Sequence, residues 1–224
     1  MPLRRRLIQL VLGLVTAGIG LALGVRADLG LGPWDVLHQG IAERAGVSMG
    51  LVVIAVGVVV LLSWVPLHQR LAMGTVINVF TVGAVLDLSL GVLPEIHGMV
   101  AQGSAMVAGV VAVGLGSGLY LGAGLGPGPR DGLMTALAAR GPSIRLVRTA
   151  IEVSALGLGW LLGGTIGVGM VVFALAIGPL VQLFLDAFDL SRPLEPASGP
   201  ATGQVPVAGA RTRRQLPRRS STRT

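Results

Sequence analysis

The hydrophobic positions gather into long runs that are separated by short polar or glycine-rich segments. Each run is close to the ~20 residues that a helix needs to cross ~30 Å of hydrocarbon. The runs cover residues 7–25, 51–65, 71–93, 105–121, 146–162 and 165–188. This pattern predicts an all-α integral membrane protein with about six transmembrane helices. The second and fifth runs are the weakest, so a five-span protein remains an alternative.

Composition supports a membrane protein and narrows its chemistry. The 224 residues are 52% hydrophobic and only 12% charged, whereas a soluble domain has about 25% charged residues. The chain contains no cysteine, which excludes disulfides and thiolate-bound zinc or iron–sulfur clusters. Three scattered histidines do not form a metal-binding pattern, so we expect no metal and no cofactor.

All 17 basic residues are arginine, and the net charge is +7. In a soluble protein this charge would suggest nucleic acid, but here the positions of the arginines fit membrane topology better. With the N-terminus inside and six spans, only Arg26 and Arg44 fall outside. The positive-inside rule favours that orientation. We therefore expect a bacterial inner-membrane protein with both termini cytoplasmic and no nucleic-acid partner, with Trp64 and Trp160 as interfacial anchors.

A nine-residue motif occurs twice. Residues 29–37 read LGLGPWDVL and residues 125–133 read LGPGPRDGL. The shared motif positions are Leu29, Gly30, Gly32, Pro33, Asp35 and Leu37 in the first copy and Leu125, Gly126, Gly128, Pro129, Asp131 and Leu133 in the second. Matches continue upstream and downstream, in the pairs Gly18/Gly114, Gly20/Gly116, Gly74/Gly169 and Gly83/Gly178.

The repeat divides the chain into residues 1–95, 96–190 and an Arg-rich tail at 191–224, expected to be disordered and cytoplasmic. Each of the first two parts holds three predicted spans. Because three is odd, the second part must enter the membrane from the opposite side. The two parts are therefore predicted to be inverted three-helix repeats, with the first motif outside and the second inside.

Each motif is predicted to start a short helix. Gly30 and Gly32 permit a tight turn, and Pro33 suits the first helical position. Asp35 then lies in the first turn, where a carboxylate stabilises the helix dipole. A helix from Pro33 to Ala45 is about 20 Å long, too short to span the membrane. Its counterpart should run from Pro129 to about Arg140.

These residues also carry a family resemblance. The paired Gly-x-Gly-Pro-x-Asp-x-Leu motif and the segment LGLGPWDVLHQGIA at 29–42 resemble the YczE/YyaS/YitT group of bacterial integral membrane proteins, in particular its YczE-like branch. The resemblance covers about residues 3–190. It implies an inner-membrane protein of five or six helices. It implies no substrate and no functional residues.

Asp35 and Asp131 are the leading candidates for a binding site. Either they stabilise the first turns of the short helices, or they form a pair of polar sites at broken helices, as in transporters. Such sites would accept a cation, a zwitterion, a neutral solute or a proton more easily than an anion. Arg130 beside Asp131 weakens this argument on the inner side. His38 shares a helix face with Asp35, although its repeat partner, Met134, does not support a shared role.

Further polar residues lie within the apolar runs, where ionisable groups are costly. Asn78 and Asp87 complete the set of candidate binding residues. Glu152 follows Arg148 by four positions, so the two are expected to pair near the cytoplasmic face.

The chain has no Walker A, HExxH or GxSxG motif, and we expect no enzymatic activity. The sequence favours a small secondary transporter or permease for an unknown solute. A non-transporting membrane scaffold or regulatory protein is the alternative. The expected partners are the lipid bilayer and a small solute, and the glycine spacings would also allow a homodimer.

Overall fold

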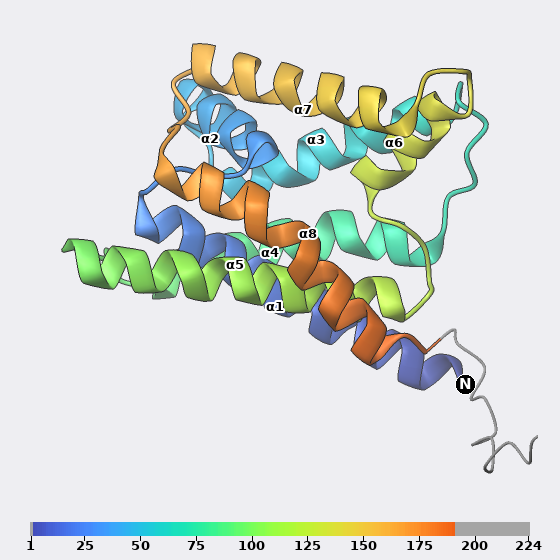
Figure 1. Cartoon of the computed structure of the whole chain (residues 1–224), viewed down its shortest axis with the longest axis horizontal. Coiled ribbons are helices and arrows are strands. Elements are labelled where there is room, and N and C mark those ends of the chain that lie inside the picture. Colours follow the sequence, from blue (N-terminus) through green and yellow to red (C-terminus); the bar gives the residue numbers. More distant parts are fainter. Residues whose placement is uncertain (1, 191–224) are drawn as a thin grey trace, which may run out of the picture. The chain divides into compact units, whose positions relative to one another are not determined.

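The structure is a computed structural model that describes residues 2–190, so the predicted tail at 191–224 lies outside the described residues. Within residues 2–190 the regular structure is entirely helical, as predicted. Figure 1 labels the eight helices of this part. They are α1 (Leu3–Ala27), α2 (Pro33–Ala45), α3 (Met49–Trp64), α4 (Met73–Val92), α5 (Met99–Gly122), α6 (Pro129–Ala138), α7 (Ile144–Leu161) and α8 (Val168–Phe188).

All six predicted apolar runs fall on helices, but they are not equally suited to cross a membrane. By length and apolar composition, four helices of the described chain could do so: α1, α4, α5 and α8. A fifth span is available if α2 and α3, which meet at 115°, are counted as one broken segment. Helix α7, which holds the fifth predicted run, does not qualify because its first half carries Arg145, Arg148 and Glu152.

The two short helices begin as the sequence predicts. The helices start at Pro33 and Pro129, and their N-cap glycines have nearly the same backbone angles. Gly32 has φ −62° and ψ 157°, and Gly128 has φ −60° and ψ 157°. Two residues earlier, Gly30 and Gly126 have φ values of 102° and 133°, in the region that glycine alone adopts readily. The two loops therefore start their helices with the same backbone conformation.

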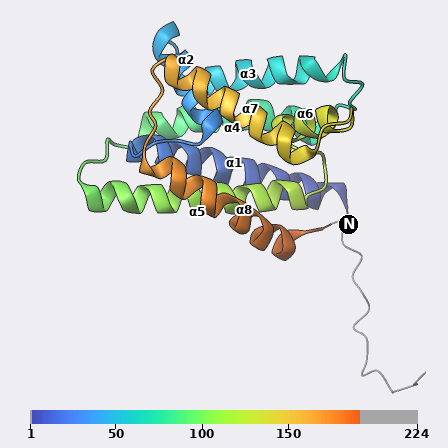
Figure 2. The same ribbon diagram turned by 45° about the horizontal axis from the view of Figure 1, so that its top comes forward.

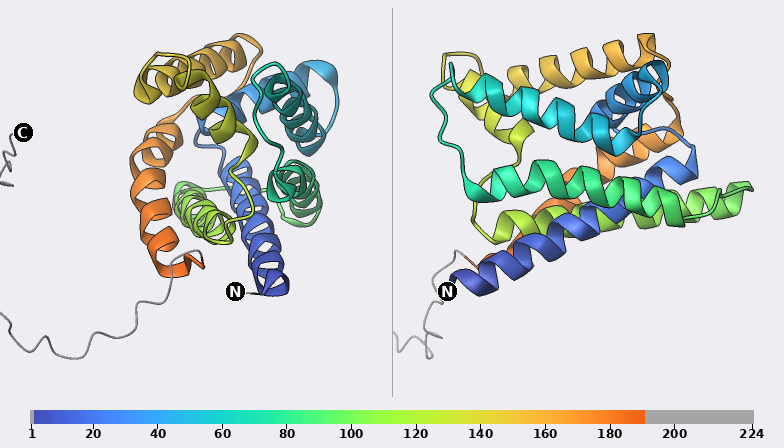
Figure 3. Two further views of the ribbon diagram at one scale, coloured as in Figure 1. Left: turned by 90° about the vertical axis from the view of Figure 1, so that its right-hand side faces the viewer. Right: turned by 180° about the vertical axis from the view of Figure 1, so that it is seen from behind.

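The longest helices pack side by side in the order α8, α5, α1, α4, as the views in Figure 2 and Figure 3 show. A second group contains α2, α3, α6 and α7. In this group α2 packs on α7, and α6 packs on both α3 and α7. The short helix of each half therefore packs against a helix of the other half.

Glycines allow α1 and α5 to touch backbone to backbone. A Cβ atom added to Gly20 would lie 2.8 Å from the carbonyl oxygen of Gly109, and one added to Gly116 would lie 2.5 Å from that of Gly13. The early residues of α1 contact the late residues of α5, so the two helices are antiparallel. Such close approach is the usual result of small residues at membrane helix interfaces.

Contacts elsewhere occur in matching pairs. Leu29 accepts a backbone hydrogen bond from Gly169 N–H at 2.7 Å, and its repeat counterpart Leu125 accepts one from Gly74 N–H at 3.1 Å. Each motif loop is therefore held by the first turn of the last helix of the other half.

The short helices end with a second matched pair. Arg44 donates through Nε to the carbonyl oxygen of Leu162, just after α7, at 3.3 Å. Arg140 donates through Nη2 to the carbonyl oxygen of Pro66, just after α3, at 3.4 Å. In both cases an arginine supplies a donor to the C-terminal end of a helix in the other half, where free carbonyl groups need one.

Candidate functional site

The two motif loops meet at one cavity. It has a volume of about 550 Å³, and every helix of the described chain contributes to its wall. That volume lies within the range of about 300–1,000 Å³ typical of small-molecule sites. Its main polar lining residues are Trp34, Asp35, His38, Asn78, Ser117, Tyr120, Arg130, Asp131, Arg148, Glu152 and Gln182.

The first contact across the cavity joins equivalent positions of the two repeats. Trp34 and Arg130 follow the proline in their respective motifs, and Arg130 Cζ lies 4.8 Å from the centre of the Trp34 ring. A guanidinium group at this distance from an indole makes a cation–π interaction. Two tryptophans or two arginines could not make this interaction. The two motifs therefore differ at this position in a way that makes their side chains complementary.

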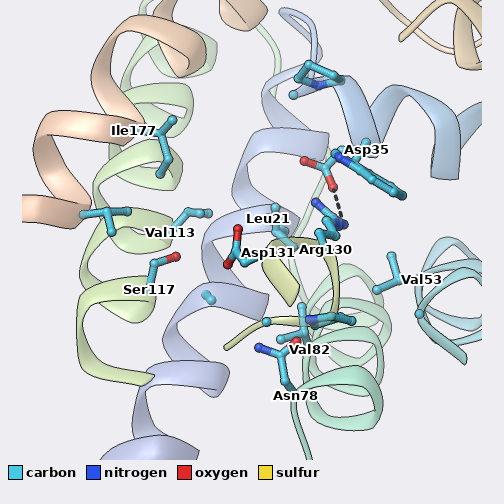
Figure 4. Close-up of a pocket in the computed structure, with 18 of the residues that line it drawn as sticks. Leu21, Asp35, Val53, Asn78, Val82, Val113, Ser117, Arg130, Asp131 and Ile177 are labelled. Carbon is cyan, nitrogen blue, oxygen red and sulfur yellow. Dashed lines mark ion pairs between the residues drawn. The ribbon is translucent and has the colours of Figure 1, made fainter. Parts of the chain in front are cut away.

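Arg130 also faces Asp35, the carboxylate of the other motif. The distance from Arg130 Nη2 to Asp35 Oδ1 is 3.9 Å, which is a loose ion pair (Figure 4). Asp35 Oδ1 lies 3.5 Å from His38 Nδ1 on the next turn of α2. The first half therefore supplies an aromatic ring, a carboxylate and an imidazole, and the second half supplies the guanidinium.

Several polar atoms around Asp35 have no hydrogen-bond partner in the described residues. They are Trp34 Nε1, Asp35 Oδ1 and His38 Nδ1, and all three are buried. Asp35 is only 4% exposed and His38 only 1%. Buried polar groups are nearly always hydrogen-bonded, and an unmade bond costs free energy. Such a concentration of buried donors and acceptors without hydrogen bonds is typical of a site that is completed by a bound molecule or water.

Asp131 points into the same cavity from α6 (Figure 4). It lies beside Tyr120, since a Cβ atom added to Gly128 would be 3.0 Å from Tyr120 Oη and 3.3 Å from Asp131 Oδ2. Arg148 and Glu152 of α7 line the wall as well. The predicted pair between them is confirmed, with 3.0 Å from Arg148 Nε to Glu152 Oε1.

The structure separates the remaining two candidates. Asn78 lines the cavity from α4. Asp87 does not line it and instead accepts hydrogen bonds at the start of α3, from Ser48 Oγ at 2.5 Å and from Gly50 N–H at 2.7 Å. These contacts tie α4 to the N-terminus of α3.

The structure is consistent with both roles expected for the two motif aspartates, first-turn stabilisation and solute binding. Asp35 and Asp131 lie in the first turns of α2 and α6, where they stabilise the helix dipoles. Within the described residues, however, Asp35 Oδ1 makes no hydrogen bond to its own loop. Both carboxylates also border the cavity.

Sequence reasoning missed three lining residues, and it misplaced one tryptophan that lies outside the cavity wall. Trp34, Ser117 and Tyr120 were not candidates, and only the exchange of Trp34 for Arg130 between the motifs signalled that this position is special. Trp64 was expected at the membrane interface, but it is 1% exposed, and its Nε1–H donates to the carbonyl oxygen of Pro129 at 3.2 Å. This tryptophan supports the second motif loop from within the fold. No group of three or more metal-binding side chains occurs in residues 2–190.

Comparisons with known proteins find relatives that cover most of the chain. One is an uncharacterised protein of Haemophilus influenzae, 39% identical over 178 residues, covering 79% of this chain and 82% of the relative. Another is the uncharacterised membrane protein YczE of Bacillus subtilis, 30% identical over 177 residues, covering 77% and 82%. The uncharacterised protein YyaS of the same organism is 26% identical over 182 residues, covering 78% and 89%.

No solved structure matches the chain. The family model that matches, described as a family of unknown function (DUF6198), covers residues 4–186. Together with the similarity to YczE and YyaS, this match bears out the resemblance seen in the motif segments. The chain belongs to this family of helical membrane proteins.

Proposed function

We propose that the protein is a small secondary transporter or permease that moves a small solute through the cavity between the two motif loops. The observation that carries the proposal is the meeting of Trp34 and Asp35 with Arg130 and Asp131 at one cavity. In transporters built from internal repeats, the solute site lies where broken or short helices of the two halves meet. A bilayer and a solute are the only partners that this activity requires, and no catalytic step is part of it.

The two halves are proposed to be inverted three-helix repeats that give six spans in total. Antiparallel packing of α1 on α5 supports this arrangement, because these helices are the first span of each half. Charges on α7 do not oppose a sixth span. Arg148 and Glu152 border the cavity rather than lying on a purely apolar surface, and ionisable groups are tolerated in membranes where they line a watery space.

The distribution of arginine supports the proposed location in a bacterial inner membrane with the N-terminus inside. In this orientation the α2–α3 turn faces outside and the α6–α7 turn faces inside. The cavity then lies between two short helices that approach it from opposite sides. Solute would reach it alternately from each side as one half rocks against the other.

Arg130 is suited to couple that motion to binding. It comes from the second half but contacts Trp34 and Asp35 of the first. Rocking of the halves would change these contacts, so a solute that binds Asp35 would compete with Arg130 and bias the equilibrium. A ligand shifts such an equilibrium only through its different affinities for the two states.

The proposal is tested with purified protein in two steps. A thermal-shift screen against metabolites and ions identifies solutes that stabilise the fold, and flux of these solutes is then measured in liposomes. Asp35→Asn and Asp131→Asn should each strongly reduce both the stabilisation and the flux. Glu95→Gln is the control, because Glu95 is 74% exposed and lies outside the cavity.

Two results would contradict transport. If the aspartate variants lose stability equally with and without every solute, the first-turn role explains both residues. If solutes bind at the cavity but none is moved in liposomes, the site serves a membrane scaffold or regulatory protein instead.

A further inference from the structure

The charged side chains that line the cavity include one more carboxylate than guanidinium group. Arg148 and Glu152 form a close pair at 3.0 Å, and Arg130 is opposed by Asp35 at 3.9 Å. Asp131 forms no ion pair within the described residues. One negative charge is therefore left over. Asp131 is exposed where it lines the cavity, and an excess of negative charge on the wall of a cavity attracts a cationic ligand.

Hydrogen bonding narrows the kind of cation. The Asp35 side chain is only 6% exposed, and the donors nearest to its Oδ1, His38 Nδ1 at 3.5 Å and Arg130 Nη2 at 3.9 Å, are too far away for a good hydrogen bond. A carboxylate oxygen needs an N–H or O–H group. A primary ammonium supplies three such donors, whereas a quaternary ammonium supplies none. One face of the Trp34 ring is covered by Arg130, whose positive charge would repel a quaternary cation on that face.

A second buried atom specifies another part of the ligand. Trp34 Nε1 is an indole N–H donor that lacks an acceptor among the described residues. Indole nitrogen can only donate. A ligand that completes the site therefore carries an oxygen acceptor, such as a hydroxyl or an amide carbonyl, beside its ammonium group. A carboxylate would make the ligand neutral and would leave the surplus negative charge in place.

We propose that the cavity binds a small organic monocation that has a primary ammonium group and a neutral oxygen acceptor, of the class of amino alcohols and amino-acid amides. The ammonium lies between Asp35 and Asp131, and the oxygen accepts from Trp34 Nε1. This inference rests on the proposed function, since it names the solute class of the same cavity.

The test is a matched panel of free solutes added to the purified full-length protein in lipid-free detergent. Ethanolamine, glycinamide and 3-amino-1-propanol represent the proposed class. Choline has the ethanolamine skeleton without N–H groups, glycine is the zwitterion, acetate is the anion, and sodium chloride controls for ionic strength. Binding is followed by melting temperature and by Trp fluorescence titration. Lipid-free detergent ensures that any response comes from a free solute and not from a lipid headgroup.

At least one primary ammonium of the panel should raise the melting temperature and bind about tenfold or more tightly than choline, glycine or acetate. Asp35→Asn and Asp131→Asn should each weaken its binding by about tenfold to a hundredfold. The loss of one hydrogen bond between charged groups lowers affinity by about this factor. Glu95→Gln should bind it unchanged. Trp34→Phe should weaken ethanolamine more than methylammonium, which has no oxygen.

Three outcomes overturn the inference: choline binds as well as ethanolamine, glycine or acetate binds more tightly, or no organic cation of the panel binds. The first two leave transport of another solute class intact. The proposed function fails differently, when a bound amine is not moved across liposomes. The inference and the proposed function can therefore be rejected separately.

Discussion

At the residue scale, equivalent positions of the two repeats have diverged into different tasks. Trp64 and Trp160 both lie near the end of the helix that follows the short helix of their half. Trp64 is buried against the second motif loop, where it packs on Gly132 and hydrogen-bonds to Pro129 O. Trp160 is 63% exposed. The sequence predicts both as interfacial anchors because each lies near the end of a predicted span. Position along the chain does not report which neighbours a residue meets in the fold.

This difference predicts opposite sensitivities to the same substitution. Trp64→Phe removes the hydrogen bond and leaves a gap beside Gly132, and we expect a loss of about 1–3 kcal/mol in unfolding free energy. Trp160→Phe should change it by less than about 0.5 kcal/mol. Thermal unfolding of the two purified variants in the same detergent measures both. Equal stability of the two variants would contradict a supporting role for Trp64.

At the element scale, local rules predicted the helices well. Glycine and proline set the start of α2 and α6, because a positive φ at Gly30 and Gly126 and a proline in the first turn are local requirements. The span count was harder to predict. Helix α7 combines three charges with an apolar surface, and hydropathy averages over the side that borders the cavity and the side that does not.

Packing of α1 on α5 gives a prediction at this scale. A methyl group at Gly116 would meet the backbone of Gly13 and Ala17, so Gly116→Ala should lower the unfolding free energy by about 1–3 kcal/mol through overpacking. Gly103 lies on the same helix with nothing within 4 Å of an added Cβ.

Gly103→Ala is therefore the matched control. It should be neutral or should stabilise by up to about 1 kcal/mol, because alanine favours the helix. Melting temperatures of the two variants compare them directly. If both behave alike, the glycine contact between α1 and α5 does not form.

At the scale of the whole molecule, equivalent residues of the two halves make matching contacts with the opposite half. The sequence could show that Leu29 corresponds to Leu125, but not that each is held by a glycine of the opposite half. The cavity was also beyond sequence reasoning. Arg130 and Asp35 lie on different repeats, and long-range packing alone brings them to 3.9 Å.

The proposed inverted arrangement predicts a topology that can be measured with single cysteines, since the chain has none of its own. Val47, 41% exposed, lies in the α2–α3 turn, and Pro142 is exposed in the α6–α7 turn. A membrane-impermeant maleimide should label Val47→Cys from outside in intact cells. It should label Pro142→Cys only in inside-out vesicles. Labelling of both from one side would exclude the inverted repeat.

In the proposed mechanism the shared cavity opens alternately to the two sides of the membrane, and Ser117 offers the most direct measurement of this. Ser117 lines the cavity from α5 (Figure 4). A Ser117→Cys variant should react with an impermeant maleimide in right-side-out vesicles and, separately, in inside-out vesicles. Reaction from both sides is the result predicted for alternating access. Reaction from one side only, under every solute condition tested, would contradict it.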